Sequence, residues 1–201
     1  TNTDAVLLNR ATQGLYPPGS TFKILTTLEY LNEHGTDEDY SYSCNGSFTV
    51  GNTTIHCHNN KSHGTQTLKQ AFANSCNSAY SSMGLDLDIT QFAKLCDSLL
   101  FNTSLPTKFE SSKSSFVLQS SDGDASIMST SIGQGKTLVT PFHMALIVSA
   151  IANDGVLMQP YVIDHTETYE GTVHEQNEPE TYKQLISSEN AAVLQEYMSA
   201  V

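Results

Sequence analysis

The sequence predicts a predominantly α-helical chain that also carries one or two small β-hairpins. Apolar residues recur at helical spacing over residues 22–31. Residues 144–151 are apolar nearly all round, which is typical of a buried helix. Between these segments, Gly51-Asn52 separates two short strand-like runs, as the turn of a hairpin does.

The other predicted elements rest on local signals. Pro17-Pro18-Gly19 cannot continue a helix from upstream, so the first helix begins at or just before Ser20, and Gly35 ends it. Thr140 and Ser187 are candidate caps of later helices. The remaining expectations are strands at 47–50 and 53–56, short helical runs at 68–74 and 78–83, a helix at 89–100, a polar loop at 102–124, a helix from 141 to about 153, and strand with exposed loop at 164–181.

Lys23 follows Ser20 by three residues at the beginning of the first predicted helix. A serine hydroxyl is almost fully protonated at neutral pH, so it needs a base within hydrogen-bond reach to act as a nucleophile. Residues i and i+3 share one helix face, which would place the ammonium group over the hydroxyl. Desolvation would lower the pKa of Lys23 and let it act as a neutral base. An amphipathic helix with a serine cap and a surface lysine would show the same spacing.

A second polar motif, Ser75-Cys76-Asn77, lies between two helix-like runs. A serine and an asparagine two residues apart can point at one site only from a turn. The asparagine side chain offers a carbonyl and an amide to a peptide substrate, and the serine hydroxyl can relay a proton. A simple helix cap or turn is the alternative interpretation, because both residue types favour turns.

Two of the four cysteines are candidates for a disulfide. The predicted hairpin would bring Cys44 and Cys57 within two residues of direct opposition. We therefore expect a bond between them, which an oxidising compartment would allow and which would contribute on the order of 3 kcal/mol. Cys76 and Cys96 lie on helix-like segments and are expected to be buried thiols.

Metal, nucleotide and nucleic-acid binding are not expected. The spacing of His56, Cys57, His58 and His63 fits no standard zinc pattern, so we expect no metal site and no other cofactor. Residues 133–137 (GQGKT) lack the glycine that a phosphate-binding loop requires at residue 130. The formal net charge of −12 argues against nucleic acid or an anionic membrane surface as a partner.

The two polar motifs belong to a longer pattern. Residues 9–23 (NRATQGLYPPGSTFK) resemble the first active-site motif of penicillin-binding proteins, most closely that of the monofunctional class B transpeptidases. Residues 71–80 (AFANSCNSAY) resemble the segment that carries the family's second motif, S-x-N. Residues 131–135 (SIGQG), then Thr140-Pro141 and residues 150–155 (AIANDG), resemble the family's segment around a long buried helix. The blocks come in the family's order and span nearly the whole chain.

The resemblance implies the α/β fold of the β-lactamase and penicillin-binding protein superfamily, in which a helical subdomain lies beside an antiparallel sheet. The active site of the family lies where the two meet. No K-T-G or K-S-G follows residue 155, where the family places its third motif. We therefore expect residues 1–201 to be a partial transpeptidase domain, mostly the helical subdomain. On this expectation, the N-terminal strands and the C-terminal strands that carry the third motif are missing, and with them most of the central sheet.

The resemblance also implies acyl transfer at the D-Ala-D-Ala end of a peptide. Ser20 would be the nucleophile, Lys23 its base, and Ser75 would return the proton to the leaving D-alanine. Asn77 would bind the peptide amide. An amine of a neighbouring stem peptide would then resolve the acyl-enzyme, and β-lactams would acylate the same serine. The expected partners are peptidoglycan stem peptides, β-lactam antibiotics and a membrane glycosyltransferase.

For location, the resemblance implies the extracytoplasmic face of the bacterial cell membrane, reached through an N-terminal transmembrane anchor that this chain does not include. Two other functions fit the same residues: a relative that hydrolyses or senses β-lactams, and a non-catalytic scaffold for wall synthesis. Without the strand of the third motif, we expect residues 1–201 alone to be inactive, with little or no acylation.

Overall fold

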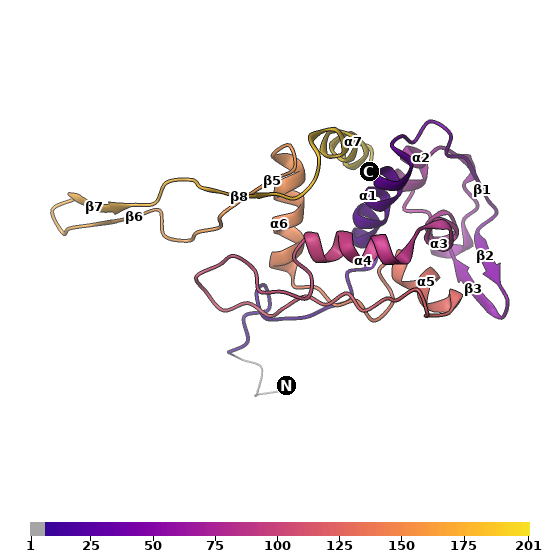
Figure 1. Cartoon of the computed structure of the whole chain (residues 1–201), viewed down its shortest axis with the longest axis horizontal. Coiled ribbons are helices and arrows are strands. Elements are labelled where there is room, and N and C mark those ends of the chain that lie inside the picture. The colour runs from indigo at the N-terminus through magenta and orange to yellow at the C-terminus, as the bar shows by residue number, and fades with distance from the viewer. Residues whose placement is uncertain (1–6) are drawn as a thin grey trace.

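The computed structural model of the chain describes residues 7–201. Helices form the body of the molecule, and a thin two-stranded arm projects from it (Figure 1). Within residues 7–201 the strands pair only two by two, always antiparallel. The prediction of a helix-rich chain with small hairpins is therefore confirmed.

The elements divide into helices and four strand pairs. The helices are η2 (Gly19–Phe22), α1 (Lys23–His34), η3 (His58–Asn60), α2 (Leu68–Ala73), α3 (Asn77–Asp86), α4 (Ile89–Ser98), α5 (Asp124–Ser131), α6 (Pro141–Ala152) and α7 (Ser188–Met198). The pairs are β1 (Tyr42–Cys44) with β4 (Gly64–Gln66), β2 (Ser47–Val50) with β3 (Thr53–His56), β5 (Val156–Met158) with β8 (Thr181–Gln184), and β6 (His165–Glu167) with β7 (Val173–Gln176).

Helix α1 lies inside the body, where it contacts α3, α4 and α7. The ring of Phe22, fully buried just before α1, lies 5.9 to 6.3 Å from the rings of Phe92, Phe101 and Phe116. A buried aromatic cluster of this size makes a large apolar contribution to the core. It therefore fixes the N-terminal end of α1, where the candidate site lies. Gly35, with a φ of 71°, ends α1 as predicted.

The predicted helix caps are confirmed. Thr140 accepts a hydrogen bond from the N–H of His143, with proline at the first helical position, and Ser187 accepts one from the N–H of Asn190. Such side-chain acceptors satisfy N–H groups that have no partner within the helix. These helices accordingly begin where local sequence signals place them.

Helix α5 was not predicted, because its segment is rich in serine and threonine, which are weak helix formers. It packs closely against α3. A methyl group added to Gly84 of α3 would lie 1.9 Å from the Oγ of Ser131 of α5, so the absence of a side chain allows this approach. Packing against α3, a tertiary contact, explains the helix. The pairs β1–β4 and β5–β8 were likewise unforeseen, since they join segments far apart in the sequence.

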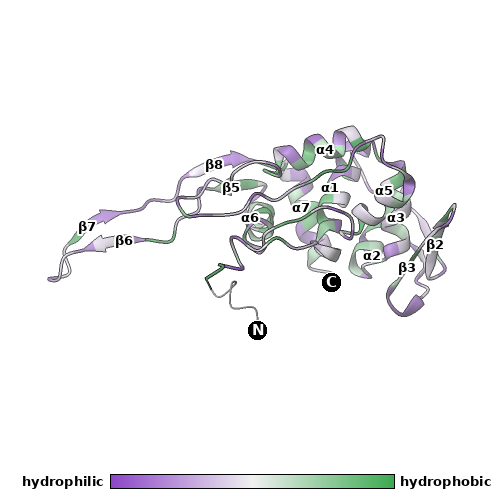
Figure 2. Ribbon diagram, turned by 90° about the horizontal axis from the view of Figure 1, so that it is seen from below, coloured by the Kyte–Doolittle hydropathy of each residue, from purple (hydrophilic) through white to green (hydrophobic). Residues whose placement is uncertain are grey.

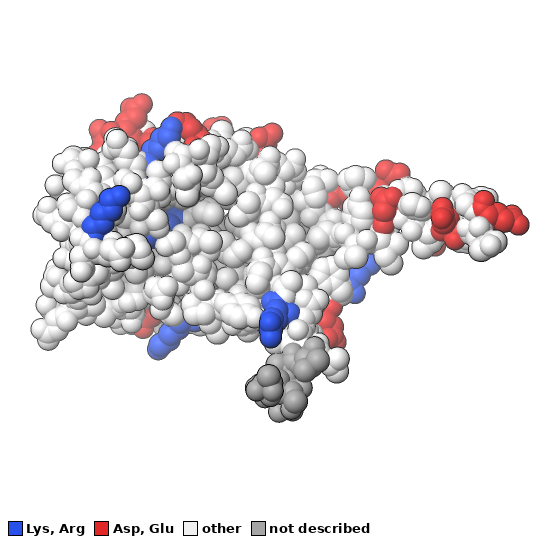
Figure 3. All heavy atoms as spheres, turned by 180° about the vertical axis from the view of Figure 1, so that it is seen from behind, with Lys and Arg blue, Asp and Glu red and all other residues white. Residues whose placement is uncertain are grey.

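The arm formed by β6 and β7 is fully exposed and predominantly hydrophilic (Figure 2). Acidic side chains lie along it (Figure 3). The prediction of strand with exposed loop for this segment is confirmed. Among residues 7–201, no helix combines the length and the apolar character that crossing a bilayer requires.

Candidate active site

Ser20 and Lys23 lie close together at the beginning of α1. Ser20 belongs to η2 and is exposed, whereas Lys23, the first residue of α1, is only 2% exposed. The Nζ of Lys23 lies 3.4 Å from the Oγ of Ser20. The structure thus places a buried amine beneath an accessible hydroxyl, on one helix face, as the spacing of three residues requires.

Ser75 and Asn77 approach the same amine from a distant part of the sequence. The Nζ of Lys23 donates to the backbone oxygen of Ser75 at 2.8 Å and to the Oδ1 of Asn77 at 2.7 Å, and lies 2.9 Å from the Oγ of Ser75. Ser75 has a φ of 48°, in the left-handed region, and α3 begins at Asn77. The turn before α3 therefore aims both side chains at Lys23, and all four predicted site residues meet.

The oxygens around Lys23 can satisfy its charged ammonium group, which donates to a serine hydroxyl as well, and they can also satisfy its neutral amine. The Nδ2 of Asn77 donates to the backbone oxygen of His56 at 2.9 Å, which leaves its Oδ1 toward Lys23. This Oδ1 and the backbone oxygen of Ser75 can only accept hydrogen bonds. A neutral amine has two N–H groups, which these two acceptors satisfy. Its lone pair then remains for the hydroxyl of Ser20 or Ser75.

Burial lowers the pKa of Lys23 from 10.5 to about 8, although the nearby thiols of Cys76 and Cys57 oppose the shift. The ring of Tyr80 lies 5.5 Å from the Nζ of Lys23, and its hydroxyl is 2.6 Å from the Oγ1 of Thr27. Tyr80 is completely buried and forms part of this environment. No local signal in the sequence indicates this role of Tyr80, although the residue belongs to the segment 71–80 that resembles the family's second motif.

The turn before Ser20 is held by a distant glycine. The N–H of Gly19 donates to the backbone oxygen of Gly133 at 2.9 Å. Gly133 has a φ of 75°, and a methyl group added to it would lie 1.9 Å from the backbone oxygen of Gly19. Only glycine fits at this position, so the Gly-Gln-Gly segment supports the active-site turn from behind.

We expect Gly133→Ala to destabilise the protein by on the order of 3 kcal/mol or more, because a strained φ adds to a collision with backbone. The matched variant Gly51→Ala also has a positive φ, 55°, but meets no atom within 4 Å. It should lose only about 1 kcal/mol. Urea unfolding of both variants measures the difference. Equal losses would show that the contact between residues 19 and 133 contributes nothing.

The predicted disulfide between Cys44 and Cys57 is not formed in this structure. The two residues do come together, as the hairpin predicted, but their Sγ atoms lie 3.7 Å apart, well beyond the bond length of about 2.05 Å. All four cysteines are buried free thiols. The expectation of buried thiols is confirmed for Cys76 and Cys96, and the expectation of a disulfide between Cys44 and Cys57 is corrected.

A hydroxyl on the first turn of a helix, a buried lysine beneath it and a serine–asparagine pair facing both form a site suited to acyl transfer through serine. The family model described as the penicillin binding protein transpeptidase domain matches residues 1–201. The chain belongs to this family of penicillin-binding proteins.

Known relatives are similar to this chain in sequence over most of its length. The peptidoglycan D,D-transpeptidase PbpA of Mycolicibacterium smegmatis is 29% identical over 96% of this chain, and the stage V sporulation protein D of Bacillus subtilis is 30% identical over 92%. The chain spans 40% and 29% of the lengths of these two relatives.

Solved structures agree. The ceftriaxone acyl-enzyme of penicillin-binding protein A from Mycobacterium tuberculosis superposes with a TM-score of 0.86 at 25% identity, covering 99% of this chain and 45% of that one. The D,D-transpeptidase domain of a peptidoglycan glycosyltransferase from Eggerthella lenta gives a TM-score of 0.85 at 27% identity, covering 97% and 50%.

Proposed function

We propose that the protein carrying this chain is a peptidoglycan D,D-transpeptidase that works through an acyl-enzyme on Ser20. The observation that carries the proposal is the position of the Lys23 amine, in contact with the hydroxyls of both Ser20 and Ser75. The names of the relatives, and the β-lactam acyl-enzymes formed by one of them, support the same reaction.

In the acylation step, the Oγ of Ser20 attacks the carbonyl carbon of the penultimate D-alanine of a stem peptide. The proton of the hydroxyl passes to the neutral amine of Lys23, which holds it as an ammonium group. Ser20 lies in the first turn of the helix, where N–H groups lack intrahelical acceptors and favour a developing oxyanion.

Collapse of the tetrahedral intermediate breaks the bond to the terminal D-alanine. Ser75 is placed to pass the proton from Lys23 to the departing amine, because its Oγ lies 2.9 Å from the Nζ. Asn77 keeps one N–H and one oxygen lone pair beyond its contacts with His56 and Lys23, and these can bind the peptide amide.

In the second step an amine of a neighbouring stem peptide attacks the ester, and Ser20 recovers its proton through Lys23. A β-lactam acylates Ser20 in the same way, but its leaving group stays tethered when the ring opens. The acyl-enzyme is then long-lived. No metal or other cofactor takes part in this scheme.

The protein is proposed to act at the extracytoplasmic face of the bacterial cell membrane, held there by an N-terminal transmembrane anchor. A membrane glycosyltransferase is the proposed partner, since cross-links join strands that such an enzyme polymerises. The Eggerthella lenta relative, described as a domain of a peptidoglycan glycosyltransferase, supports this association.

The proposal is tested by following both products of the reaction. With a D-Ala-D-Ala peptide and an acceptor amine, we expect release of D-alanine together with the cross-linked peptide. With a penicillin, intact mass should show one stable adduct per chain. Rapid turnover of a chromogenic cephalosporin would instead indicate a β-lactam hydrolase. A protein with neither adduct nor product would be a non-catalytic scaffold.

A further inference from the structure

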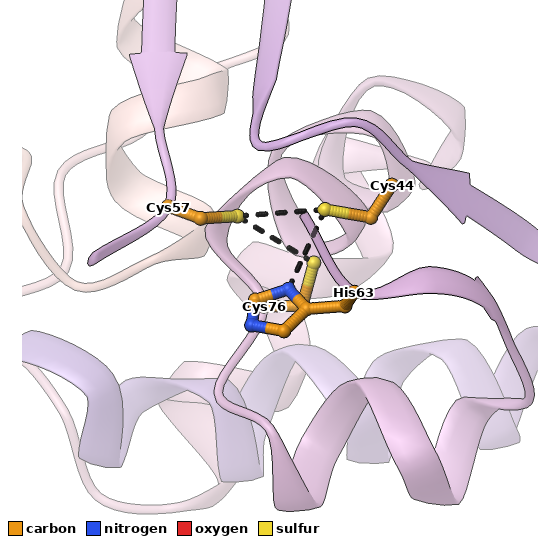
Figure 4. Close-up of side chains that lie close together, drawn as sticks. All are labelled: Cys44, Cys57, His63 and Cys76. Carbon is orange, nitrogen blue, oxygen red and sulfur yellow. Dashed lines mark hydrogen bonds between the residues drawn. The ribbon is translucent and has the colours of Figure 1, made fainter. Parts of the chain in front are cut away.

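A buried cluster of three cysteines and one histidine lies directly behind the S-x-N turn (Figure 4). It consists of Cys44, Cys57, His63 and Cys76, which we call the Cys₃His cluster. The three cysteines are buried and His63 is partly exposed. The four come from the end of β1, the residue after β3, the loop before β4 and the residue before α3. Their side chains point toward one another from four separate segments.

The separations fit a tetrahedral metal ion. With zinc–sulfur bonds of about 2.3 Å, two sulfurs of a tetrahedral site lie about 3.8 Å apart, and a sulfur and an imidazole nitrogen about 3.5 Å apart. The Sγ of Cys57 lies 3.7 Å from that of Cys44 and 3.7 Å from that of Cys76, and the Sγ of Cys44 lies 3.4 Å from the Nδ1 of His63. All four ligand atoms lie within 4.8 Å of one another, so small side-chain rotations close the tetrahedron.

Neighbouring groups also suit metal-bound sulfur. The N–H of Gly46 lies 3.4 Å from the Sγ of Cys44, and the Oγ of Ser78 lies 3.1 Å from the Sγ of Cys57. Hydrogen bonds of this kind commonly orient thiolate ligands.

We propose that the Cys₃His cluster binds one structural Zn²⁺ ion. Four protein ligands complete a tetrahedral shell, which is typical of structural zinc, and the soft sulfur donors select zinc over magnesium or calcium. No metal was expected because the spacing of His56, Cys57, His58 and His63 fits no standard zinc pattern, whereas the ligands of the cluster stand 13, 6 and 13 residues apart in the sequence. The fold, and not a local motif, assembles the site.

The position of Cys76 gives the ion a second consequence, which rests on the proposed function. Cys76 lies between Ser75 and Asn77, the two residues that contact Lys23. A metal bond to its sulfur would hold the turn whose left-handed residue, Ser75, aims both groups at the amine. Zinc would thus link the ends of β1 and β3, through Cys44 and Cys57, to the turn that positions Ser75 and Asn77.

The first experiment measures metal in the protein that carries this chain, purified without added chelator. We expect about one zinc per chain by mass spectrometry of metals, because the site is a single tetrahedron. Cobalt replacement should give the intense visible bands of tetrahedral cobalt–thiolate. Cys57→Ser should lose both signals. Cys96→Ser, which alters an equally buried cysteine outside the cluster, should keep them.

Counting thiols separates the metal from a disulfide. Protein unfolded with a chelator but no reductant should have Cys44, Cys57, Cys76 and Cys96 all alkylated, as read by peptide mapping, if zinc holds the cluster, and Cys44 and Cys57 unmodified if they are bonded to each other. Unmodified Cys44 and Cys57, or alkylation of all four without bound metal, would overturn the proposal. This readout does not depend on Cys57→Ser being well folded.

Removal of the ion tests the link to catalysis. Chelation should lower the melting temperature and slow acylation by a fluorescent penicillin, and added Zn²⁺ should restore both. If zinc is bound but acylation is unchanged by its removal, the ion is structural and the link to the S-x-N turn is wrong. Loss of the transpeptidase reaction with zinc still bound would count against the proposed function alone.

Discussion

Ser20→Ala is expected to abolish covalent labelling by penicillin. Ser75 is also exposed and its Oγ lies 2.9 Å from the Nζ of Lys23, but only Ser20 of these two lies in the first turn of the helix, where N–H groups without intrahelical acceptors favour a developing oxyanion. Intact mass spectrometry of the protein that carries this chain should therefore show one adduct when Ser20 is present and none in the variant. The fold should be unaffected, because the Oγ of Ser20 is exposed and its contact with Lys23 is long, 3.4 Å. Changes at such positions are usually within about 0.5 kcal/mol.

Ser120→Ala is the matched control, since Ser120 is exposed in a loop and makes no contact with the site. It should label fully. Peptide mapping of the parent adduct should locate the acyl group on the peptide that contains residue 20. An adduct of equal amount on Ser20→Ala would refute the assignment of the nucleophile.

Replacing Lys23 is expected to slow acylation by about 10² to 10⁴-fold, the usual contribution of a general base. Lys23→Met removes the amine and nearly preserves the volume. Lys23→Arg keeps a positive charge that cannot be lost near neutral pH. Both should be slow if the amine acts as a base, whereas only the methionine variant should be slow if charge alone matters. Stopped-flow labelling measures the rates, and Lys94→Met, on the exposed face of α4, is the control.

The pH dependence tests the same role. Burial lowers the pKa of Lys23 to about 8, so the active neutral form is the minor one at pH 7 and increases as the pH rises. Acylation should become about tenfold faster per unit of pH below 8 and level off above about 9. This increase of the acylation rate with pH should be missing in Lys23→Arg. A rate that is flat or falls from pH 6 to 9 would contradict a neutral lysine base.

Lys23→Met also has a structural cost that must be measured separately. It leaves the backbone oxygen of Ser75 and the Oδ1 of Asn77 without their donor in a partly buried site. Such losses typically cost about 1 to 3 kcal/mol. Thermal unfolding of the same samples shows whether slow acylation reflects chemistry or a disturbed turn.

Local signals in the sequence predicted much of the helical body. Proline and glycine before Ser20, the glycine after α1 and the caps at Thr140 and Ser187 each act over one turn of chain, and the structure confirms them. The segment of α5 gave no such signal, because serine and threonine are poor helix formers and its partner surface lies on α3. No rule based on local sequence can detect a surface of that kind.

The candidate site, too, was predicted from the sequence only in part. The spacing between Ser20 and Lys23 predicted their approach, and the family resemblance predicted that Ser75 and Asn77 would join them. The bond predicted between Cys44 and Cys57 was wrong for this structure, although their proximity was right. The register of a hairpin brings two side chains close together, but it does not determine which side chains from other segments lie beside them.

The sequence by itself determined the local geometry of this protein: where its helices begin, which serine and lysine share a face, and which segments carry the family's motifs. The reason is that helix caps and i, i+3 contacts involve neighbours within one turn. Only the tertiary structure decided that the amine of Lys23 meets oxygens 52 residues away, and that Cys76 gathers two further thiols and an imidazole. Those encounters depend on how the strands and α3 pack, and packing is a property of the whole fold.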